Sequence, residues 1–253
     1  MRATLIRRTA LAASVASLTL LATACGSSDG GDGKDGSSKP APKALSAAEL
    51  EKAIITKDDV KGYKVEKLAD QLKEQGKVAV DKGECQAIAD TMSLKALGKP
   101  AGTAQRQATK DFEKPSLEGA SPEEIEKALK GAMSANTYVT LASYQDKGAE
   151  EALTSLKSAG TACAGGFGGT SDGEKVTLTK IVESPATGGD EAGSWTVFMD
   201  MEGKEVPFYQ LTAVRKGSTL ATFGTINLSA VMGKGGEAEK STEVIDAQVK
   251  KLG

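Results

Sequence analysis

SWTVFMDMEGKEVPFYQLTAVRKGSTLATFGTI, residues 194–226, is the stretch of this 253-residue chain that decides its fold. Around Trp195 apolar and polar residues alternate, as they do in a strand with one buried face. Turns at 202–205 and 216–217 separate the runs, and such short turns join antiparallel strands because parallel pairing needs a long crossover. Together with the run just before it, the stretch predicts four consecutive antiparallel strands, near 175–182, 194–201, 206–215 and 219–226.

Helical signals surround these strands. Ser46 and Glu49 have the spacing of a capping box, which predicts a short helix to about residue 55. Further helices are expected near 84–97, from Ser121, near 150–163 and at the C-terminus, with two more strands near 64–68 and 138–144. We therefore predict a single α+β domain over residues 45–253, in which a curled antiparallel meander sheet has helices packed on one face.

The first 25 residues are typical of a bacterial lipoprotein. Three arginines, the last two being Arg7 and Arg8, precede a run of about twelve mostly apolar residues at 11–22, which is shorter than the roughly 20 residues of a membrane-spanning helix. Small residues then lead to Cys25, so we expect a signal peptide at 1–24 and acyl chains, such as palmitate, on Cys25. This lipid anchor predicts attachment to the extracytoplasmic face of the cell membrane, and Arg7-Arg8 leaves export by the twin-arginine route open.

Residues 25–44 are rich in Gly, Ser and Asp and contain no large apolar side chain. Such a segment cannot bury enough surface to offset the entropy lost on ordering, so we expect a flexible tether. The chain after residue 24 carries 29 Lys and Arg against 34 Asp and Glu, a net charge of −5. A mildly acidic chain has little with which to neutralise phosphates, so nucleic acid is not an expected partner, and the membrane is expected only through the lipid anchor.

Two cysteines remain once Cys25 is assigned to lipid. Cys85 and Cys163 each fall on the buried face of a predicted helix. Outside the cytoplasm such a pair forms a disulfide, which predicts a covalent link between the two helices. A metal site is not expected, since the chain contains no His and two lone cysteines make an incomplete zinc site.

One pattern suggests catalysis, but its chemistry is incomplete. Residues 169–173, Gly-Thr-Ser-Asp-Gly, match the G-x-S-x-G of a nucleophile elbow, with Ser171 as the nucleophile. That elbow joins a strand to a helix, whereas the order expected here is helix, loop and strand, and no His is present to act as base. We expect neither enzymatic activity nor a cofactor, and we interpret residues 164–169 as a flexible glycine-rich loop.

Aromatic residues are scarce and gather in the predicted meander, where they are Trp195, Phe198, Phe208, Tyr209 and Phe223. The simplest interpretation is that they fill the core between the sheet and its helices. The functional alternative is that some of them line a concave apolar pocket, with the glycine-rich loop as a mobile rim. Trp195 and Tyr209 are the first candidates for ligand-binding residues.

Several short motifs together resemble a known family. They are Leu-Ser-x-x-Glu-Leu at 45–50, Asp-Asp-Val-x-Gly-Tyr at 58–63, Cys85, the strand of Tyr144 with the Ala-rich helix ending at Cys163, and the C-terminal strands that close on a helix. These look like the extracellular PknH-like sensor domain of some actinobacterial serine/threonine kinases and stand-alone lipoproteins. The resemblance spans 45–253 and implies an α+β fold with a cleft and a ligand-binding role. The chain departs from the kinase sensors in having one possible disulfide instead of two.

Three functions follow as hypotheses. The first is a membrane-anchored, extracytoplasmic lipoprotein that binds or senses an unknown small molecule or envelope component. The second is a lipid or glycolipid carrier of the cell envelope, which needs a deep apolar tunnel. The third is a non-enzymatic protein-interaction partner, which predicts an exposed apolar patch without an enclosed cavity.

Overall fold

The described part of the chain, in a computed structural model, comprises residues 43–73, 78–111, 121, 123–125, 136–171, 173–233 and 240–253. The predicted signal peptide (1–24), the predicted lipidation site Cys25 and the tether up to residue 42 lie outside the described residues. Nearly all of the helix predicted from Ser121 lies outside them as well.

The end of the expected tether is already part of the folded domain. The carbonyl of Lys43 accepts a hydrogen bond from Ser218 Oγ at 2.9 Å. Ala44 is buried, and the next residue, Leu45, donates its N–H to Ser143 Oγ at 2.9 Å. The domain therefore includes Lys43 and Ala44, slightly before the boundary expected from composition.

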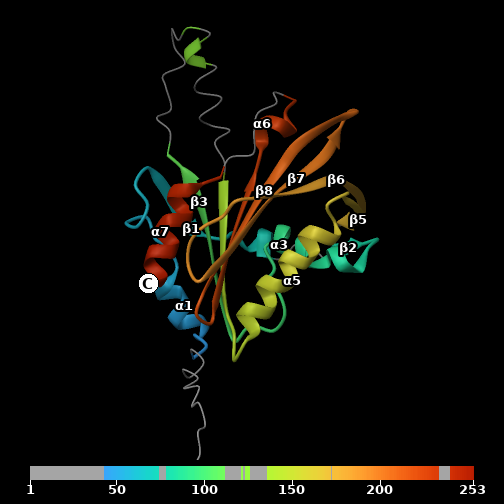
Figure 1. The fold of residues 1–253 in the computed structure, drawn as a ribbon. Helices are drawn as coiled ribbons and strands as arrows, with labels where there is room; N and C mark the ends of the chain where they lie inside the picture. The colour runs from blue at the N-terminus through green and yellow to red at the C-terminus, as the bar shows by residue number, and fades with distance from the viewer. Residues whose placement is uncertain are drawn as a thin grey trace, which may run out of the picture. The chain divides into compact units, whose positions relative to one another are not determined.

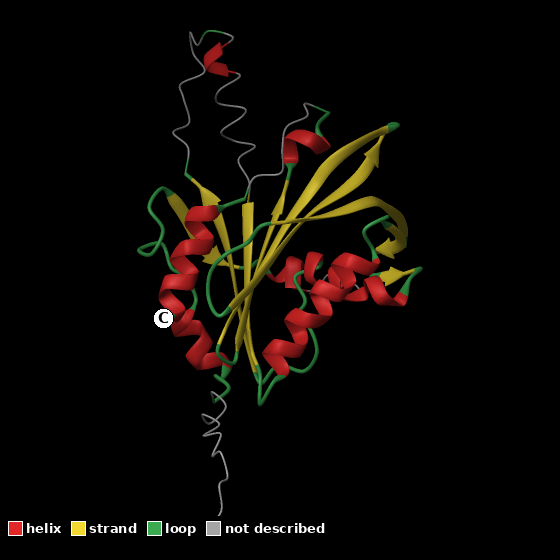
Figure 2. Cartoon of the chain, viewed as in Figure 1, coloured by secondary structure: helices red, strands yellow, loops and turns green. Residues whose placement is uncertain are grey.

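The described strands form one antiparallel sheet of nine strands, strongly twisted in Figure 2. They are β1 (Tyr63–Lys67), β2 (Ala79–Val80), β3 (Gly102–Lys110), β4 (Asn136–Ser143), β5 (Phe167–Ser171), β6 (Glu174–Ser184), β7 (Glu191–Met201), β8 (Lys204–Lys216) and β9 (Thr219–Ile226). Their order across the sheet is β1-β3-β4-β9-β8-β7-β6-β5-β2. The predicted α+β class is confirmed, and β6 to β9 are the four predicted strands of the antiparallel meander.

Helices cover both faces of the sheet, not the single face expected from the sequence. They are α1 (Ala47–Ala53), α2 (Asp70–Lys73), the 3-10 helix η1 (Gly83–Cys85), α3 (Gln86–Met92), α5 (Gly148–Ala162), α6 (Leu228–Val231) and α7 (Thr242–Leu252). Figure 1 shows α1 and α7 on one side of the sheet and α3 and α5 on the other. No helix in the described ranges is both long and apolar enough to cross a membrane.

The reason for two helical layers is that the central strands bury apolar side chains on both faces. Neighbours in one strand face opposite ways, and Leu141 packs in a core with α1 and α7 whereas Ala142 packs in a core with α3 and α5. In β8, likewise, Ala213 packs in the core with α3 and α5, and Val214 packs in the core with α1 and α7. We call these two surfaces the α7 face and the α5 face.

Tight turns set the register of the meander. Between β7 and β8 the two loop residues, Glu202 and Gly203, have φ angles of 55° and 81°. Two residues with positive φ match a type I′ turn, whose twist suits a hairpin. The carboxylate of Asp200 accepts a hydrogen bond from Gly203 N at 2.7 Å and helps to hold the turn.

The glycine-rich segment 164–169, expected to be a flexible loop, instead leads into β5, which lies between β6 and β2. Its glycines allow close approach of neighbouring backbone. A Cβ on Gly169 would lie 2.8 Å from the carbonyl oxygen of Ala79 in β2. Gly168 donates its N–H to the carboxylate of Asp81 at 3.0 Å. Glycine is needed in this segment because a side chain would collide with the neighbouring strand, not because the segment has to be flexible.

The predicted disulfide between Cys85 and Cys163 is confirmed. Its Cα atoms are 5.9 Å apart, and both residues are fully buried on the α5 face. The bond joins the start of α3 to the C-terminal end of α5, so it fixes two helices that are distant in sequence.

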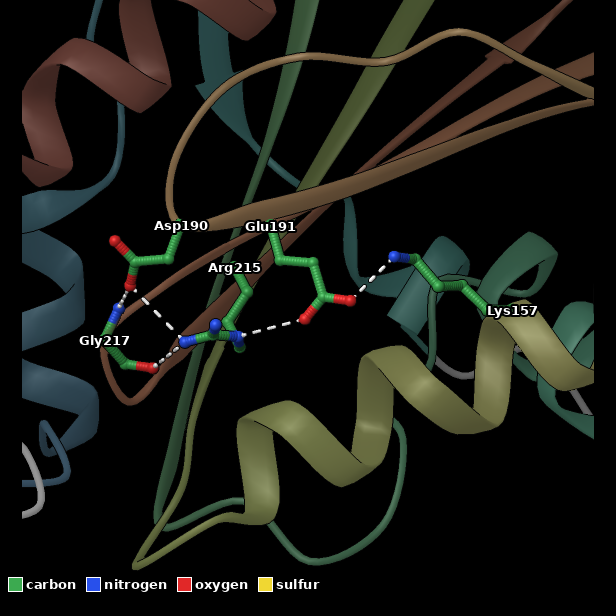
Figure 3. A network of polar contacts seen from close by, with 5 residues as sticks. All are labelled: Lys157, Asp190, Glu191, Arg215 and Gly217. Atoms are coloured by element: carbon green, nitrogen blue, oxygen red, sulfur yellow. Dashed lines mark hydrogen bonds and ion pairs between the residues drawn. The ribbon is translucent and has the colours of Figure 1, made fainter.

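A polar network attaches α5 to the sheet (Figure 3). Lys157 of α5 donates to Glu191 of β7 at 2.7 Å, and this hydrogen bond holds the pKa of the Glu191 carboxyl below its usual range. Glu191 also faces Arg215 Nε at 3.6 Å, and Arg215 pairs with Asp190 at 3.4 Å. Asp190 accepts Gly217 N at 2.7 Å, which links the network to the β8–β9 turn. Exposed pairs of this kind contribute about 0–1 kcal/mol each, so their main role is to set positions.

Replacing both disulfide cysteines, Cys85→Ala with Cys163→Ala, is expected to lower the free energy of unfolding by about 4 kcal/mol, because the bond closes a long loop in the unfolded chain. Urea denaturation of the variant and the wild type measures the difference. An unchanged unfolding midpoint would show that the covalent link is not formed in the protein.

Candidate functional site

A small hollow on the α5 face is the candidate site. It encloses about 130 Å³ between the end of α3 and the sheet, and it is partly open to solvent. We call it the tyrosine hollow. Its lining residues come from two helices, three strands and the segment after α3, and they are Leu72, Met92, Leu94, Tyr138, Phe208, Tyr209 and Ile226. An engineered apolar cavity of about 150 Å³ in another protein holds benzene, so this hollow suits a ligand of one ring.

A β-bulge creates one wall of the hollow. Phe208 and Tyr209 both line it, although consecutive strand residues normally face opposite sides. Val197 of β7 pairs with Tyr209, whereas the next residue of β7 pairs with Pro207, so Phe208 is an extra residue in β8. Asn227 supports the bulge by donating to the carbonyls of Phe208 and Pro207 at 2.8 and 2.9 Å. The bulge thus turns two adjacent aromatic rings toward one space.

A glycine provides room at the floor of the hollow. Tyr138 of β4 lies directly opposite Gly224 of β9. A Cβ on Gly224 would overlap the hydroxyl group of Tyr209, which reaches this point from β8. Gly224 is therefore required for the close approach of the Tyr209 ring to β9. Tyr138 and Tyr209 thus both lie next to Gly224, Tyr138 from β4 and Tyr209 from β8.

The hydroxyl group of Tyr209 is the unusual polar feature of this site. Tyr209 is only 2% exposed, and no described residue gives its hydroxyl a hydrogen-bond partner. Burial raises the pKa of Tyr209, and the nearby Tyr138 raises this pKa further. Burial also raises the pKa of Tyr138. Both phenols stay protonated at neutral pH. Buried hydroxyls are normally paired, so a buried Tyr209 hydroxyl without a partner among the described residues is an exception.

The rim includes a residue in a strained backbone conformation. Leu94 has a φ of 59°, a left-handed value that a leucine seldom adopts. Its N–H donates to the Thr91 carbonyl at 3.0 Å, and its own carbonyl accepts from Gln105 Nε2 at 2.7 Å. Gln105 also donates to Thr140 Oγ1 at 3.2 Å, which anchors the arrangement on the sheet. Strain of this kind collects at ligand sites, where the surrounding structure maintains it.

Trp195, the other ligand-binding candidate from the sequence, does not line the tyrosine hollow. It is fully buried beneath α5, in the space left by Gly160 of that helix and by Gly193, whose Cβ would lie 2.5 Å from the indole ring. The structure places Tyr209 at the hollow and Trp195 in the core of the α5 face. The glycine-rich segment does not contribute to the lining either.

A second hollow, of about 240 Å³, lies beside α1 and β3 and is polar. Arg106 is its most buried charge, and its guanidinium contacts the Glu51 carboxylate at 2.7 Å and the Gln105 carbonyl at 2.8 Å. An arginine paired in this way serves to join α1 to the sheet. This hollow is a weaker candidate because its central charge is already satisfied.

The described residues show neither a nucleophile elbow nor a metal cluster. Ser171 lies at the end of β5 and pairs with Glu174 of β6, so a strand follows it instead of a helix. Among the residues that the structure describes, no three His, Cys, Asp or Glu side chains are placed to hold a metal ion.

The comparisons with known proteins support the fold. The structure aligns with the crystal structure of the extracellular domain of PknH from Mycobacterium tuberculosis, with a TM-score of 0.51 and 8% sequence identity, over 83% of this chain and 96% of that domain. No family profile and no curated protein matches the sequence. The resemblance to the PknH-like sensor domain is thus supported as a shared fold.

Replacing Tyr209→Phe is expected to leave the free energy of unfolding unchanged or to raise it by about 1 kcal/mol, because the lost hydroxyl has no partner in the protein. The matched control, Tyr144→Phe, removes a hydroxyl that donates to the Leu97 carbonyl at 2.8 Å on the same face. It is expected to lower stability by about 1–2 kcal/mol. Urea denaturation compares the two, and equal losses would mean that the Tyr209 hydroxyl is bonded in the folded protein.

Proposed function

We propose that this protein is a lipid-anchored, extracytoplasmic module that binds or senses a small molecule in the tyrosine hollow, and that it is not an enzyme. The observation that carries this proposal is the tyrosine hollow itself, an apolar space of about 130 Å³ lined by Tyr209, whose fully buried hydroxyl has no partner among the described residues. A β-bulge at Phe208 and a strained rim residue, Leu94, build the same space. Three independent local irregularities at one place favour a binding site over a packing defect.

The location is supported by three further features. The leader and Cys25 are typical of a lipid-modified export signal. The Cys85–Cys163 disulfide suits an oxidising compartment. The fold is shared with a domain described as extracellular. Membrane attachment in this proposal comes through the acyl chains on Cys25.

The size and surface of the domain favour a small-molecule site over the two other hypotheses. At about 130 Å³ the hollow is below the roughly 300–1,000 Å³ of pockets for drug-sized ligands, so it is far from the tunnel that a lipid carrier needs. The exposed large hydrophobic residues in the described ranges are Ile125, Val182 and Met232, which belong to three separate segments. They give no indication of one continuous docking patch.

Filling the hollow is expected to abolish ligand retention. Met92→Trp places a larger side chain in the lining, whereas Met232→Trp makes the same change at a residue that is 58% exposed. Native mass spectrometry of each protein, purified from its own host, detects a noncovalent small molecule. We expect it with the wild type and Met232→Trp and not with Met92→Trp. Equal retention by both variants would place the ligand elsewhere.

Replacing Cys25→Ala is expected to release the protein from the membrane fraction and to remove the mass of the acyl chains. The measurement is intact mass after purification, together with detergent phase partitioning. Ser27→Ala is the matched control, since it changes a nearby residue that is not expected to carry lipid and leaves the disulfide cysteines in place. An acylated Cys25→Ala protein would contradict the anchor.

A further inference from the structure

Leu94, at the rim of the tyrosine hollow, occupies a backbone position that usually belongs to glycine. Helix α3 ends in a Schellman motif. The N–H of Leu94 donates to the Thr91 carbonyl at 3.0 Å, and the N–H of Lys95 donates to the Asp90 carbonyl at 2.9 Å. This motif places the residue between them in the left-handed conformation, and Leu94 has a φ of 59°. Glycine adopts that conformation without steric cost, whereas the Cβ of leucine opposes it.

The chain uses glycine at the corresponding position of another helix. After α6, Gly233 has a φ of 70° and donates its N–H to the Ala230 carbonyl at 2.9 Å. This bond spans the same number of residues as the bond from Leu94 to Thr91. The turn after α3 therefore does not itself require a leucine, and the side chain of Leu94 needs another explanation.

Packing within the domain does not supply that explanation. Met92, Phe208 and Ile226, which line the same hollow, also pack against the core of the α5 face. Leu94 is half-buried and belongs to neither core of the described residues. Its side chain does line the hollow. An apolar group in the hollow would therefore give this leucine contacts that the described residues do not.

The lining of the tyrosine hollow limits the chemistry of such a group. No charged side chain is among the lining residues. A charged ligand group would lose its hydration here without gaining a counter-ion, so an uncharged group is favoured. The hollow of about 130 Å³ is partly open, so a larger ligand would insert one group and keep the remainder outside.

We infer that the ligand inserts an uncharged apolar group of about one ring, and that Leu94 is a specificity-determining residue that contacts this group. The inference rests on the proposed function of the tyrosine hollow as a binding site. In this role Leu94 lowers the stability of the free protein through its backbone conformation and contributes apolar contact to the complex.

Three probes with one ring each test the ligand class: toluene, benzoate and benzylamine. At neutral pH they are uncharged, anionic and cationic. Binding of each probe to the full chain is measured by protein-observed NMR. We expect the wild type to bind toluene more tightly than either charged probe. Met92→Trp, which fills the hollow, is expected to weaken toluene binding about tenfold or more.

Variants of Leu94 test its role. Leu94→Gly removes the side chain and the backbone strain, and Leu94→Met keeps an apolar side chain of similar size. The matched control is Glu202→Gly, which replaces a residue with a φ of 55° in the β7–β8 turn, outside the lining of the hollow.

We expect Leu94→Gly to bind toluene about tenfold more weakly than the wild type, with a urea midpoint that is unchanged or higher. Leu94→Met is expected to bind within about twofold of the wild type, because it restores the apolar contact. Glu202→Gly is expected to leave toluene binding unchanged. A leucine with only a structural role would instead lower the urea midpoint when removed.

The possible failures are distinguishable. If Leu94→Gly binds toluene as the wild type does, or if it unfolds at a lower midpoint or does not fold, the role of Leu94 is overturned while the hollow remains a binding site. If a charged probe binds as tightly as toluene, if Met92→Trp leaves toluene binding unchanged, or if no probe binds, the ligand class is overturned. Retention of the host ligand by Met92→Trp and Met232→Trp then shows whether the hollow itself has failed as a site.

Discussion

The sheet has to be covered on both faces, and this constraint organises the whole domain. Leu141 and Ala142, neighbours in β4, are both buried and face opposite layers, so one layer of helices would leave apolar surface in water. On the α7 face a specific contact ties α7 to the end of α1. The amide of Gln248, fully buried, accepts from Ile55 N and donates to the Ala53 carbonyl, each at 2.9 Å, which satisfies the backbone at the end of α1. The tyrosine hollow belongs to the other layer, between the end of α3 and the sheet.

The bulge at Phe208 connects the fold to the site. In a regular strand Phe208 and Tyr209 would point to opposite faces, and only one ring would reach the α5 face. The extra residue interrupts the pairing of β7 with β8, and Asn227 compensates by donating to the two nearby carbonyls. Gly224 then removes the side chain that would otherwise collide with the Tyr209 hydroxyl. A local loss of strand regularity thus lets two adjacent aromatic residues line the same hollow.

Local signals in the sequence predicted most elements, and long-range pairing explains what they missed. The capping box at Ser46 and the turns of the meander depend on adjacent residues, so the sequence was sufficient for them. The glycines of 164–169 suggested flexibility because the close approach of β2, which makes them necessary, comes from a distant segment. The sequence could not show that Tyr209 lines the hollow whereas Trp195 is buried in the core, since alternation alone does not show which ring α5 covers. Pro207 within a strand is a signal that could have indicated the bulge.

The walls of the tyrosine hollow are held open by contacts that a ligand would not touch. An apolar space of this size would gain contact energy by collapsing, so some constraint has to oppose collapse. The wall formed by Met92 follows from the position of α3, and the disulfide at Cys85 fixes that helix to α5. Lys157 in turn fixes α5 to β7. Leu94 remains in a conformation that costs about 1–3 kcal/mol because the sheet, through Gln105, holds its carbonyl. Under the proposed function, strain maintained in this way is preorganisation, which lowers the entropic cost of binding.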